Sequence, residues 1–400
     1  MQVANFPRVA IVVLGALAAA CSSSPSDPAP VASACAPVAI DRFKELLVVD
    51  DAVVTDPRAS NSLDGPWSFR ERMRELAGGS EADARELTMG WLRQFGDTSK
   101  VNLFSVPSRP QTNSVLICPW LKRTDANECN QDCSTCTKTD LDLAKAPFRL
   151  IGIANRLDLH DVEPARRGEA RYVYALTDGA SDAASSAPMR MTIGFEYALP
   201  ATGQHTVRSW AERWHALGSH ATFDASYRAD LAALLADVAA GETSPGPLAQ
   251  LRTNDRELDW DWSMREFKLS NGALVEGPVF NTPDRSLNAG PELAAFVLAS
   301  QAAVLKDNHV VPTKFIGGNS SPAGPWSLPQ VPENLRKAFA RNTCDGCHQT
   351  EATPADINFH ISPFRAGVDR VSPFLSNPAA PETDELARRA EQMQTALCGL

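Results

Sequence analysis

The sequence lacks an excess of positive charge, a long apolar run and the common nucleotide-binding or hydrolase motifs. Its 38 Lys and Arg against 48 Asp and Glu give a formal net charge of -10, so no field attracts a phosphate backbone and nucleic acid is excluded as an expected partner. The apolar run at 9–20 holds twelve residues, whereas a membrane-spanning helix needs about 20. No G-x-S-x-G, P-loop or G-x-G-x-x-G sequence is present, so serine hydrolase, nucleotidase and dinucleotide-binding functions have no local support.

Cysteine, in contrast, is abundant: the chain has nine cysteines and seven histidines. With 44% hydrophobic and 22% charged residues among 400, the composition is that of a globular protein of one large or two ordinary domains. A reducing cytosol has little use for so many thiols unless they bind metal or take part in chemistry. The cysteines therefore indicate export, metal binding or a cofactor.

The N-terminus has the pattern of a secretory signal at 1–20. Arg8 precedes the apolar run, which ends in small residues before Cys21. This ending resembles the bacterial lipobox, with Leu17 one position further upstream than usual, and the resemblance implies a lipid on Cys21 that anchors the protein to a membrane. An ordinary signal peptide that is cleaved before a cysteine is the alternative. Residues 21–38, rich in Ser, Pro and Ala, predict a flexible tether. We expect a cell-envelope location, as an outer-membrane lipoprotein facing the periplasm or the cell surface.

Residues 39–316 predict an α+β body domain with a mainly antiparallel sheet and flanking helices. Period-two or continuous apolar runs predict strands, and apolar residues three or four apart predict helices. The predicted strands are 148–159, 171–177, 189–199, 257–269 and 274–280, and the predicted helices of the body are 69–76, 82–95, 207–217 and 226–240. A Gly- and Pro-rich linker at 317–332 then leads to a small all-α C-terminal module at 333–400.

This module contains the pattern C-x-x-C-H, formed by Cys344, Cys347 and His348. Two thiols one turn apart reach the two vinyl groups of a haem, and the adjacent histidine places an imidazole nitrogen under the iron. The pattern predicts one covalent haem c with His348 as its proximal axial ligand. A C-x-x-C disulfide followed by an incidental histidine is the alternative.

The surroundings of the motif resemble class I c-type cytochromes, which have a helix with an aromatic residue before the motif and a closing helix that crosses it. Phe339 lies five residues before Cys344, and 382–397 predicts an amphipathic closing helix. The resemblance implies a small cytochrome c-like fold for the module. The family usually supplies a methionine as sixth iron ligand from the loop before the last helix, but no methionine occurs between His348 and Pro381.

His360 is the candidate distal ligand because it lies in that loop, twelve residues after His348. Two imidazoles would give an iron of low potential that is suited to electron transfer. A loop histidine that is hydrogen-bonded to backbone is the alternative. Met393 is the runner-up ligand, although its helical register favours a place in the core. If neither residue binds, the iron is five-coordinate and open to peroxide or dioxygen.

The chain as a whole resembles uncharacterised lipoproteins of myxobacteria and related Gram-negative bacteria, which end in a similar N-T-C-x-G-C-H stretch. Similar upstream blocks are PFRLIGIANRLDL at 147–159, WAERWHALG at 210–218 and LRTNDREL at 251–258. The resemblance covers most of the chain and implies no particular activity.

Setting aside Cys21 for lipid and the motif cysteines for haem leaves an even number, which predicts disulfides in an exported protein. The disulfide candidates are Cys35, Cys118, Cys129, Cys133, Cys136 and Cys398. Four of them lie in a polar insertion at 118–136, where three pairings are possible and a four-thiolate zinc site is the alternative. Cys35 and Cys398 would then pair by default.

Two further groups of residues are candidate sites. In a strand, 259–262 (DWDW) would place two carboxylates on one face and two indoles on the other. The carboxylates could serve acid–base chemistry or bind calcium, but a solvated face opposite a packed face is favoured. His215 and His220 are five residues apart, diverge around a helix and make a poor metal pair.

Three functions are compatible with these patterns. The first is electron transfer through one covalent haem by a lipid-anchored protein that has a redox protein as partner. The second is a haem-dependent peroxidase or oxygenase that holds a substrate over an open iron, and the body domain is larger than an electron carrier needs. The third is a haem-free surface-binding protein stapled by disulfides.

Overall fold

The structure is a computed structural model that describes residues 35–123, 133, 135, 141–160, 167–179, 186–200, 205–240, 248–259, 262–321, 324–350, 359–381 and 384–399. The predicted signal, Cys21, Cys129, Cys136 and residues 260–261 lie outside these described residues. The chain divides into Met1–Pro37 and a compact unit, Val38–Leu400. Within the described part of the chain, no helix has the length and apolar character needed to cross a membrane.

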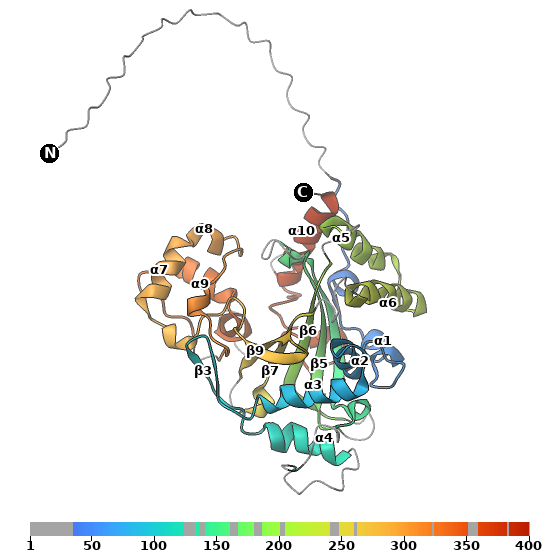
Figure 1. The fold of residues 1–400 in the computed structure, drawn as a ribbon. Helices are drawn as coiled ribbons and strands as arrows, with labels where there is room; N and C mark the ends of the chain where they lie inside the picture. Colours follow the sequence, from blue (N-terminus) through green and yellow to red (C-terminus); the bar gives the residue numbers. More distant parts are fainter. Residues whose placement is uncertain are drawn as a thin grey trace, which may run out of the picture. The chain divides into compact units, whose positions relative to one another are not determined.

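A seven-stranded antiparallel sheet runs through the compact unit (Figure 1). Its strands are ordered β1-β4-β5-β6-β7-β8-β9, and each pairs antiparallel with its neighbours. They are β1 Leu47–Val48, β4 Phe148–Arg156, β5 Glu169–Thr177, β6 Pro188–Ala198, β7 Leu248–Asn254, β8 Met264–Ser270 and β9 Ala273–Gly277. The strands β2 Ser99–Val101 and β3 Phe104–Val106 form a separate hairpin. The α+β class with a mainly antiparallel sheet is confirmed.

The helices flank this sheet. They are α1 Asp51–Val54, α2 Phe69–Leu76, α3 Glu81–Arg93, α4 Cys118–Arg123, α5 Val207–Ala216, α6 Ala225–Ala240, α7 Pro291–Ala299, α8 Gln301–Val304, α9 Glu333–Arg341 and α10 Glu385–Cys398. Side-chain caps fix several of their starts: Ser68 accepts a hydrogen bond from the N–H of Glu71 in α2, and Asp384 accepts one from the N–H of Ala387 in α10.

Most predicted elements agree with the observed ones. The helix predicted at 69–76 is α2, and the strands predicted at 148–159, 171–177 and 189–199 overlap β4, β5 and β6. The strand predicted at 257–269 is wrong in its first part, because Arg256–Leu258 forms a 3-10 turn and β8 begins only at Met264. Strand β7 and helix α7 lie in stretches for which no element was predicted.

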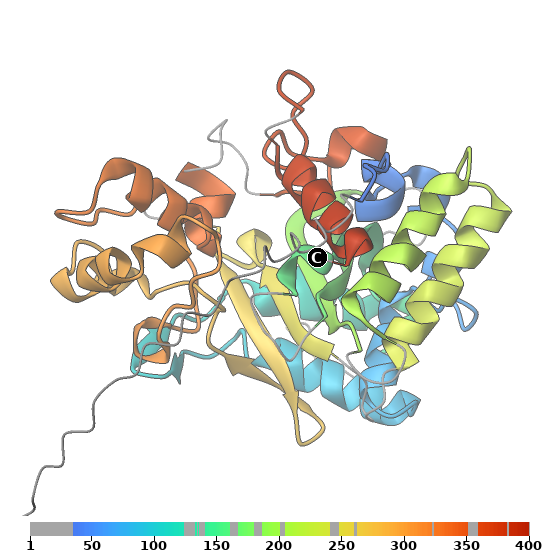
Figure 2. The ribbon, with the colours of Figure 1, turned by 90° about the horizontal axis from the view of Figure 1, so that it is seen from above.

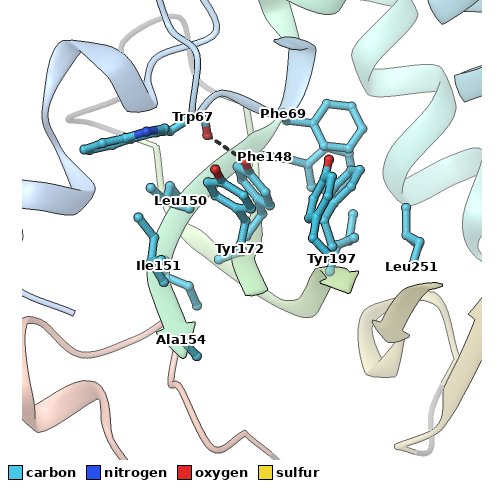
Figure 3. Close-up of a cluster of buried hydrophobic side chains, with 14 of the residues drawn as sticks. Trp67, Phe69, Phe148, Leu150, Ile151, Ala154, Tyr172, Tyr197 and Leu251 are labelled. Carbon is cyan, nitrogen blue, oxygen red and sulfur yellow. Dashed lines mark hydrogen bonds between the residues drawn. The ribbon is translucent and has the colours of Figure 1, made fainter. Parts of the chain in front are cut away.

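One face of the sheet carries the main hydrophobic core. Successive strand residues point to opposite faces, so Tyr172 and Tyr174 of β5 enter this core together with Phe195 of β6. Phe69 of α2 packs on Phe148 with ring centroids 4.5 Å apart, and lies 5.9 Å from Phe195. Figure 3 shows Phe69, Phe148 and Tyr172 of this aromatic cluster. The hydroxyl of Tyr174 donates a hydrogen bond to the carbonyl of Trp67 (2.5 Å). Helices α2, α3 and α4 therefore cover this face.

A second, smaller core lies where α7, α8 and α9 gather at one end of the sheet, away from α5 and α6 (Figures 1 and 2). Phe339 of α9 packs there against Trp326, with ring centroids 6.2 Å apart. Trp326 and Leu328 come from the segment 317–332, which was predicted to be a linker, and both are buried. The Gly- and Pro-rich segment thus contributes to a core.

Residues 333–400 belong to the same compact unit as the body. Helix α9 contributes Leu335 and Phe339 to the second core, whereas α10 contributes Leu386 and Met393 to the main core and packs against α5. In the cytochrome plan the corresponding helices cross each other. A separate cytochrome-like module is therefore not confirmed by the fold.

Candidate cofactor site at the C-x-x-C-H motif

The C-x-x-C-H motif follows directly after α9, and local hydrogen bonds set its turn. The hydroxyl of Thr343 donates to the carbonyl of Ala340 (2.7 Å) and accepts from the N–H of Gly346 (3.2 Å). The N–H of Cys347 donates to the carbonyl of Thr343 at 2.9 Å. Gly346 has no room for a side chain, because a Cβ there would lie 2.1 Å from the carbonyl oxygen of Ala340. These contacts fix the spacing of the two cysteines.

The buried Asp345 ties the motif to the second core. Its carboxylate accepts hydrogen bonds from Arg285 (3.1 Å) and from the indole N–H of Trp326 (3.3 Å). Burial raises the pKa of Asp345, although Thr343 and Arg285 oppose this effect. On the other side, the N–H of Cys344 donates to the hydroxyl of Thr282 at 2.9 Å. The motif is thus held by side chains that are distant from it in sequence.

Both thiols of the motif are free. Burial raises the pKa of Cys344 and raises the pKa of Cys347 to about 12. Catalytic dithiols have the opposite property, because a lowered pKa supplies the attacking thiolate. In this structure Cys344 and Cys347 form no disulfide with each other.

Two imidazoles meet beside these thiols. The rings of His348 and His360 have centroids 4.2 Å apart and are tilted by 47°. Trp262 stacks on His348 at 5.0 Å, with 28° between the ring planes. The Nε2 atom of His360 lies 3.3 Å from the sulfur of Cys347. The fold therefore brings His360 next to the motif.

A short hairpin-like loop positions His360. Ile361 and Val371 form a β-bridge, and the carbonyl of His360 accepts a hydrogen bond from the N–H of Ser372 at 2.9 Å. The hydroxyl of Ser372 lies 3.1 Å from Nδ1 of His360, and Phe374 packs on the ring at 4.9 Å. Burial, with His348 and nearby arginines, holds the pKa of His360 well below its usual value, so the neutral ring keeps a lone pair at neutral pH.

Met393, the runner-up ligand, lies elsewhere. It is buried in the main core, and its sulfur is 4.0 Å from Nδ2 of Asn155. The residue does not line the cavity that the motif faces. Met393 is therefore a core residue, as its helical register favoured, and the structure removes it as a candidate iron ligand.

The motif faces a cavity of about 810 Å³. Cys344, Cys347, His348 and His360 line it, together with Phe374. The polar face of the sheet, opposite the main core, also lines it through the strand residues Glu169, Arg171, Glu196 and Arg252. From α10 come Glu385, Arg388 and Arg389. Thiols, imidazoles, aromatic rings and buried charges thus meet around one space.

No protein-family model, curated protein or solved structure matches this chain. The cavity and its side chains alone therefore carry the functional conclusion.

The charges of the cavity wall form two networks. Among the strands, Arg171 pairs with Glu169 (2.6 Å) and Glu196 (3.2 Å), and Arg252 pairs with Glu196 (3.2 Å) and Glu266 (3.0 Å). These two arginines face three carboxylates. The second network, which we call the arginine cluster, has the reverse balance and contains Arg156, Arg388 and Arg389 with Asp158 and Glu385.

The charged cavity wall was not predicted from the sequence. A usable signal exists in β5, where Glu169 and Arg171 alternate with the apolar residues of the core face. An ionisable residue at alternate positions of a strand indicates a solvated surface or a polar site. Only the structure distinguishes the two, because Glu169 and Glu196 are buried.

The remaining predicted sites take no part in this cavity. Cys118 pairs with Cys133 in a disulfide, so these two thiols are not zinc ligands. Cys35 and Cys398 are disulfide-bonded as well. Among the described residues, no group of three His, Cys, Asp or Glu is arranged to hold a metal ion.

The two histidines of the α5 region bind carboxylates and not each other. His215 lies 2.8 Å from Glu45, and His220 lies 2.8 Å from Asp230. Asp259 precedes β8 and lies 3.8 Å from Arg109, while Trp260 and Asp261 lie outside the described residues. Trp262 is buried against His348, which confirms that this indole is packed.

Proposed function

We propose that this protein carries one haem c, attached through Cys344 and Cys347 with His348 as proximal ligand, and that it transfers electrons. The observation that supports this most is the meeting of two free thiols and two imidazoles on the wall of one cavity. Each thiol S–H would add across one vinyl group, forming a C–S and a C–H bond without loss of electrons. Haem supplies one-electron chemistry at this place.

The residues present fit such a group. The cavity of about 810 Å³ lies within the range of roughly 300–1,000 Å³ that is typical of organic ligand sites. Phe374 offers an apolar surface and the arginine cluster offers partners for carboxylates. Trp262 fixes the ring of His348 by stacking. These side chains would bind and orient the group and limit the access of water to it.

His360 is the proposed distal ligand. Ligating histidines usually bond a second group through their other nitrogen, which sets the ring orientation, and Ser372 provides this group at Nδ1. Nε2 then points toward Cys347. The two imidazoles are in contact, so both could hold one iron only after moving apart to make room for it.

A haem-dependent peroxidase or oxygenase is the second candidate function. The buried charge of Glu196 and its partly buried partner Arg252 favour it, because an electron carrier has no evident need of a polar wall. In that case His360 would be a polar side chain beside the haem and not its ligand, and the haem would supply the oxidative chemistry.

Export and lipid attachment through Cys21 are part of the proposal. They rest on the signal pattern at 1–20 and on the lipobox resemblance, and they place the protein in the cell envelope. The disulfide of Cys118 and Cys133 supports this location, since structural disulfides persist in oxidising compartments. With its net charge of -10, the protein suits a redox partner that presents a basic patch.

Mass spectrometry tests the cofactor. The full chain, purified from a strain with the cytochrome c maturation system, should carry the mass of one haem on the peptide that contains Cys344 and Cys347. The Cys344→Ala, Cys347→Ala double variant should carry none. A wild-type chain without this adduct would remove both haem functions and leave the disulfide-stapled binding protein.

An optical spectrum then separates the two haem functions. The reduced wild-type protein should show a six-coordinate spectrum that carbon monoxide changes slowly, whereas His360→Ala should be five-coordinate and bind carbon monoxide at once. His220→Ala is the matched control, because this histidine pairs with Asp230 away from the cavity. An identical spectrum for wild type and His360→Ala would eliminate His360 as a ligand and favour the enzyme.

A further inference from the structure

The arginine cluster has more positive than negative charge in its own contacts. Arg156 binds Asp158 through two hydrogen bonds of 2.9 and 3.0 Å. Arg388 binds both Asp158 (2.9 Å) and Glu385 (2.7 Å). Arg389 shares Glu385 at 3.0 Å. Three guanidinium groups thus share two carboxylates on the wall of the cavity.

Within this cluster, Arg389 has the most unused hydrogen-bonding capacity. Its side chain is 9% exposed and lines the cavity. Among the described residues, its guanidinium makes a single hydrogen bond, from Nε to Glu385. A guanidinium has five donors in a fixed fork, so the terminal nitrogens are left without a partner. A buried cation with unused donors is unfavourable unless a ligand completes it.

The nearby charged side chains do not supply the missing hydrogen-bond partners of Arg389. Glu169 is the carboxylate of the strand network whose ionisation Arg156 also favours, but it is bonded to Arg171 at 2.6 Å. Burial and the charge of Arg156 lower the pKa of Arg389 to about 10, which is still high enough to keep the group charged at neutral pH. The site therefore presents a positive charge and a free donor fork to the cavity.

We propose that Arg389, supported by Arg156, forms a carboxylate-binding site in the wall of the cavity. A planar fork of N–H groups matches the two oxygens of a carboxylate and binds them with short, charge-assisted hydrogen bonds. A bound carboxylate would also balance three cations with three anions. Arg388 has a different role, since both carboxylates of the cluster already engage it and its side chain is 34% exposed.

Two sources could supply this carboxylate: a propionate of the haem, or a small free acid held beside it. The first source rests on the proposed function and the second does not. Iron mesoporphyrin IX separates them, because its ethyl groups cannot react with the thiols and its two carboxylates can be masked as the dimethyl ester. Sodium benzoate serves as the free-acid probe.

The experiment titrates the full chain, produced without haem maturation, with the diacid and the diester. Wild type should bind the diacid about ten- to hundredfold more tightly than the diester. Arg389→Gln should abolish this preference and leave the diester affinity unchanged. Arg388→Gln, which removes the same charge from the same cluster, should keep the preference. Arg389→Lys retains the charge without the fork and should show an intermediate preference. Circular dichroism verifies that each variant is folded.

The outcomes separate the two proposals. Equal binding of diacid and diester, with benzoate binding that Arg389→Gln abolishes, would assign the site to a free acid. If the wild-type chain binds neither porphyrin but binds benzoate through Arg389, the haem proposal fails and the carboxylate site stands. If Arg389→Gln and Arg389→Lys alter neither the diacid preference nor benzoate binding, the carboxylate site is overturned.

Discussion

Gly346 stands between the two cysteines of the motif at a place where a side chain has no room. A Cβ would lie 2.1 Å from the carbonyl oxygen of Ala340, which is backbone and cannot swing away. We expect Gly346→Ala to destabilise the protein by about 1–3 kcal/mol, because overpacking shifts the backbone. The change would also move Cys344 and Cys347 relative to each other and lower haem attachment. Urea unfolding and the haem-to-protein ratio measure the two effects.

Gly90 provides the matched control for this substitution. It lies in α3, and a Cβ added to it would meet nothing within 4 Å, so Gly90→Ala should stabilise the protein by about 0.5–1 kcal/mol through helix propensity. If Gly346→Ala behaves like Gly90→Ala, the close approach to Ala340 is not a constraint on the motif.

At the scale of elements, α10 and β4 are joined by the buried carboxylate of Asp158. Burial opposes its ionisation, but Arg156 and Arg389 outweigh burial and hold the pKa of Asp158 well below its usual range. A carboxyl whose pKa is lowered by folding contributes stability that is present above its unfolded pKa, about 3.9, and is lost as the pH falls below that value. Asp158 therefore stabilises the junction of α10 and β4 at neutral pH.

Asp158→Asn should lower the free energy of unfolding at pH 7 by about 1–3 kcal/mol, because the partly exposed Arg156 and Arg388 lose their charged hydrogen-bond partner. The difference from wild type should shrink as the pH falls below about 3.9, because the unfolded wild-type chain then binds a proton at this carboxyl that the folded chain does not bind. Urea titrations at pH 7, 5 and 3 measure it. Asp237→Asn is the control, since Asp237 is a surface partner of Arg213 and should change stability by less than about 1 kcal/mol. A pH-independent difference for Asp158→Asn would contradict the assignment.

Helices and strands whose apolar residues repeat regularly were predictable from the sequence. Elements that place polar residues in the cavity wall were not. Helix α2 matches its prediction because its apolar face follows helical spacing. Strand β7 was missed because Gln250, Arg252 and Asn254 face the polar side of the sheet, which leaves few apolar residues to read. The segment 317–332 was predicted to be a linker, but it also packs on the fold: a Cβ at Gly318 would lie 2.4 Å from Val101.

At the scale of the molecule, the C-x-x-C-H motif was predictable from the spacing of its residues in the sequence, but the cavity that it faces was not. Cys344, Cys347 and His348 are local in sequence, so one pattern identifies them. Glu169 and Arg252 are brought to the same cavity only by strand pairing across the sheet. Arg389 joins them because α10 packs against α5 and against the turn Leu157–Leu159 that follows β4, and no local pattern encodes that contact.

Because 333–400 contributes to both hydrophobic cores, its removal should affect the whole chain. Removing 333–400 takes Ile361, Leu386, Met393 and Ala396 out of the main core, and takes Phe339 and its neighbours out of the second core. We therefore expect a chain that ends at Pro332 to lose cooperative thermal unfolding and its near-ultraviolet circular dichroism, because both cores would be opened to water.

A single core substitution serves as the reference for the effect of this truncation on stability. Met393→Ala in the full chain should cost about 2–5 kcal/mol and still unfold cooperatively, since it removes one core side chain and leaves the rest of α10 in place. A truncated chain that unfolds cooperatively near the wild-type temperature would instead make the body an autonomous domain, with 333–400 as an added module. The haem site would then belong to that module alone, and the charged wall of the sheet would have no necessary part in it. Loss of cooperativity on truncation means that the sheet and the C-x-x-C-H motif form one folding unit, so the cavity between them exists only when both are folded.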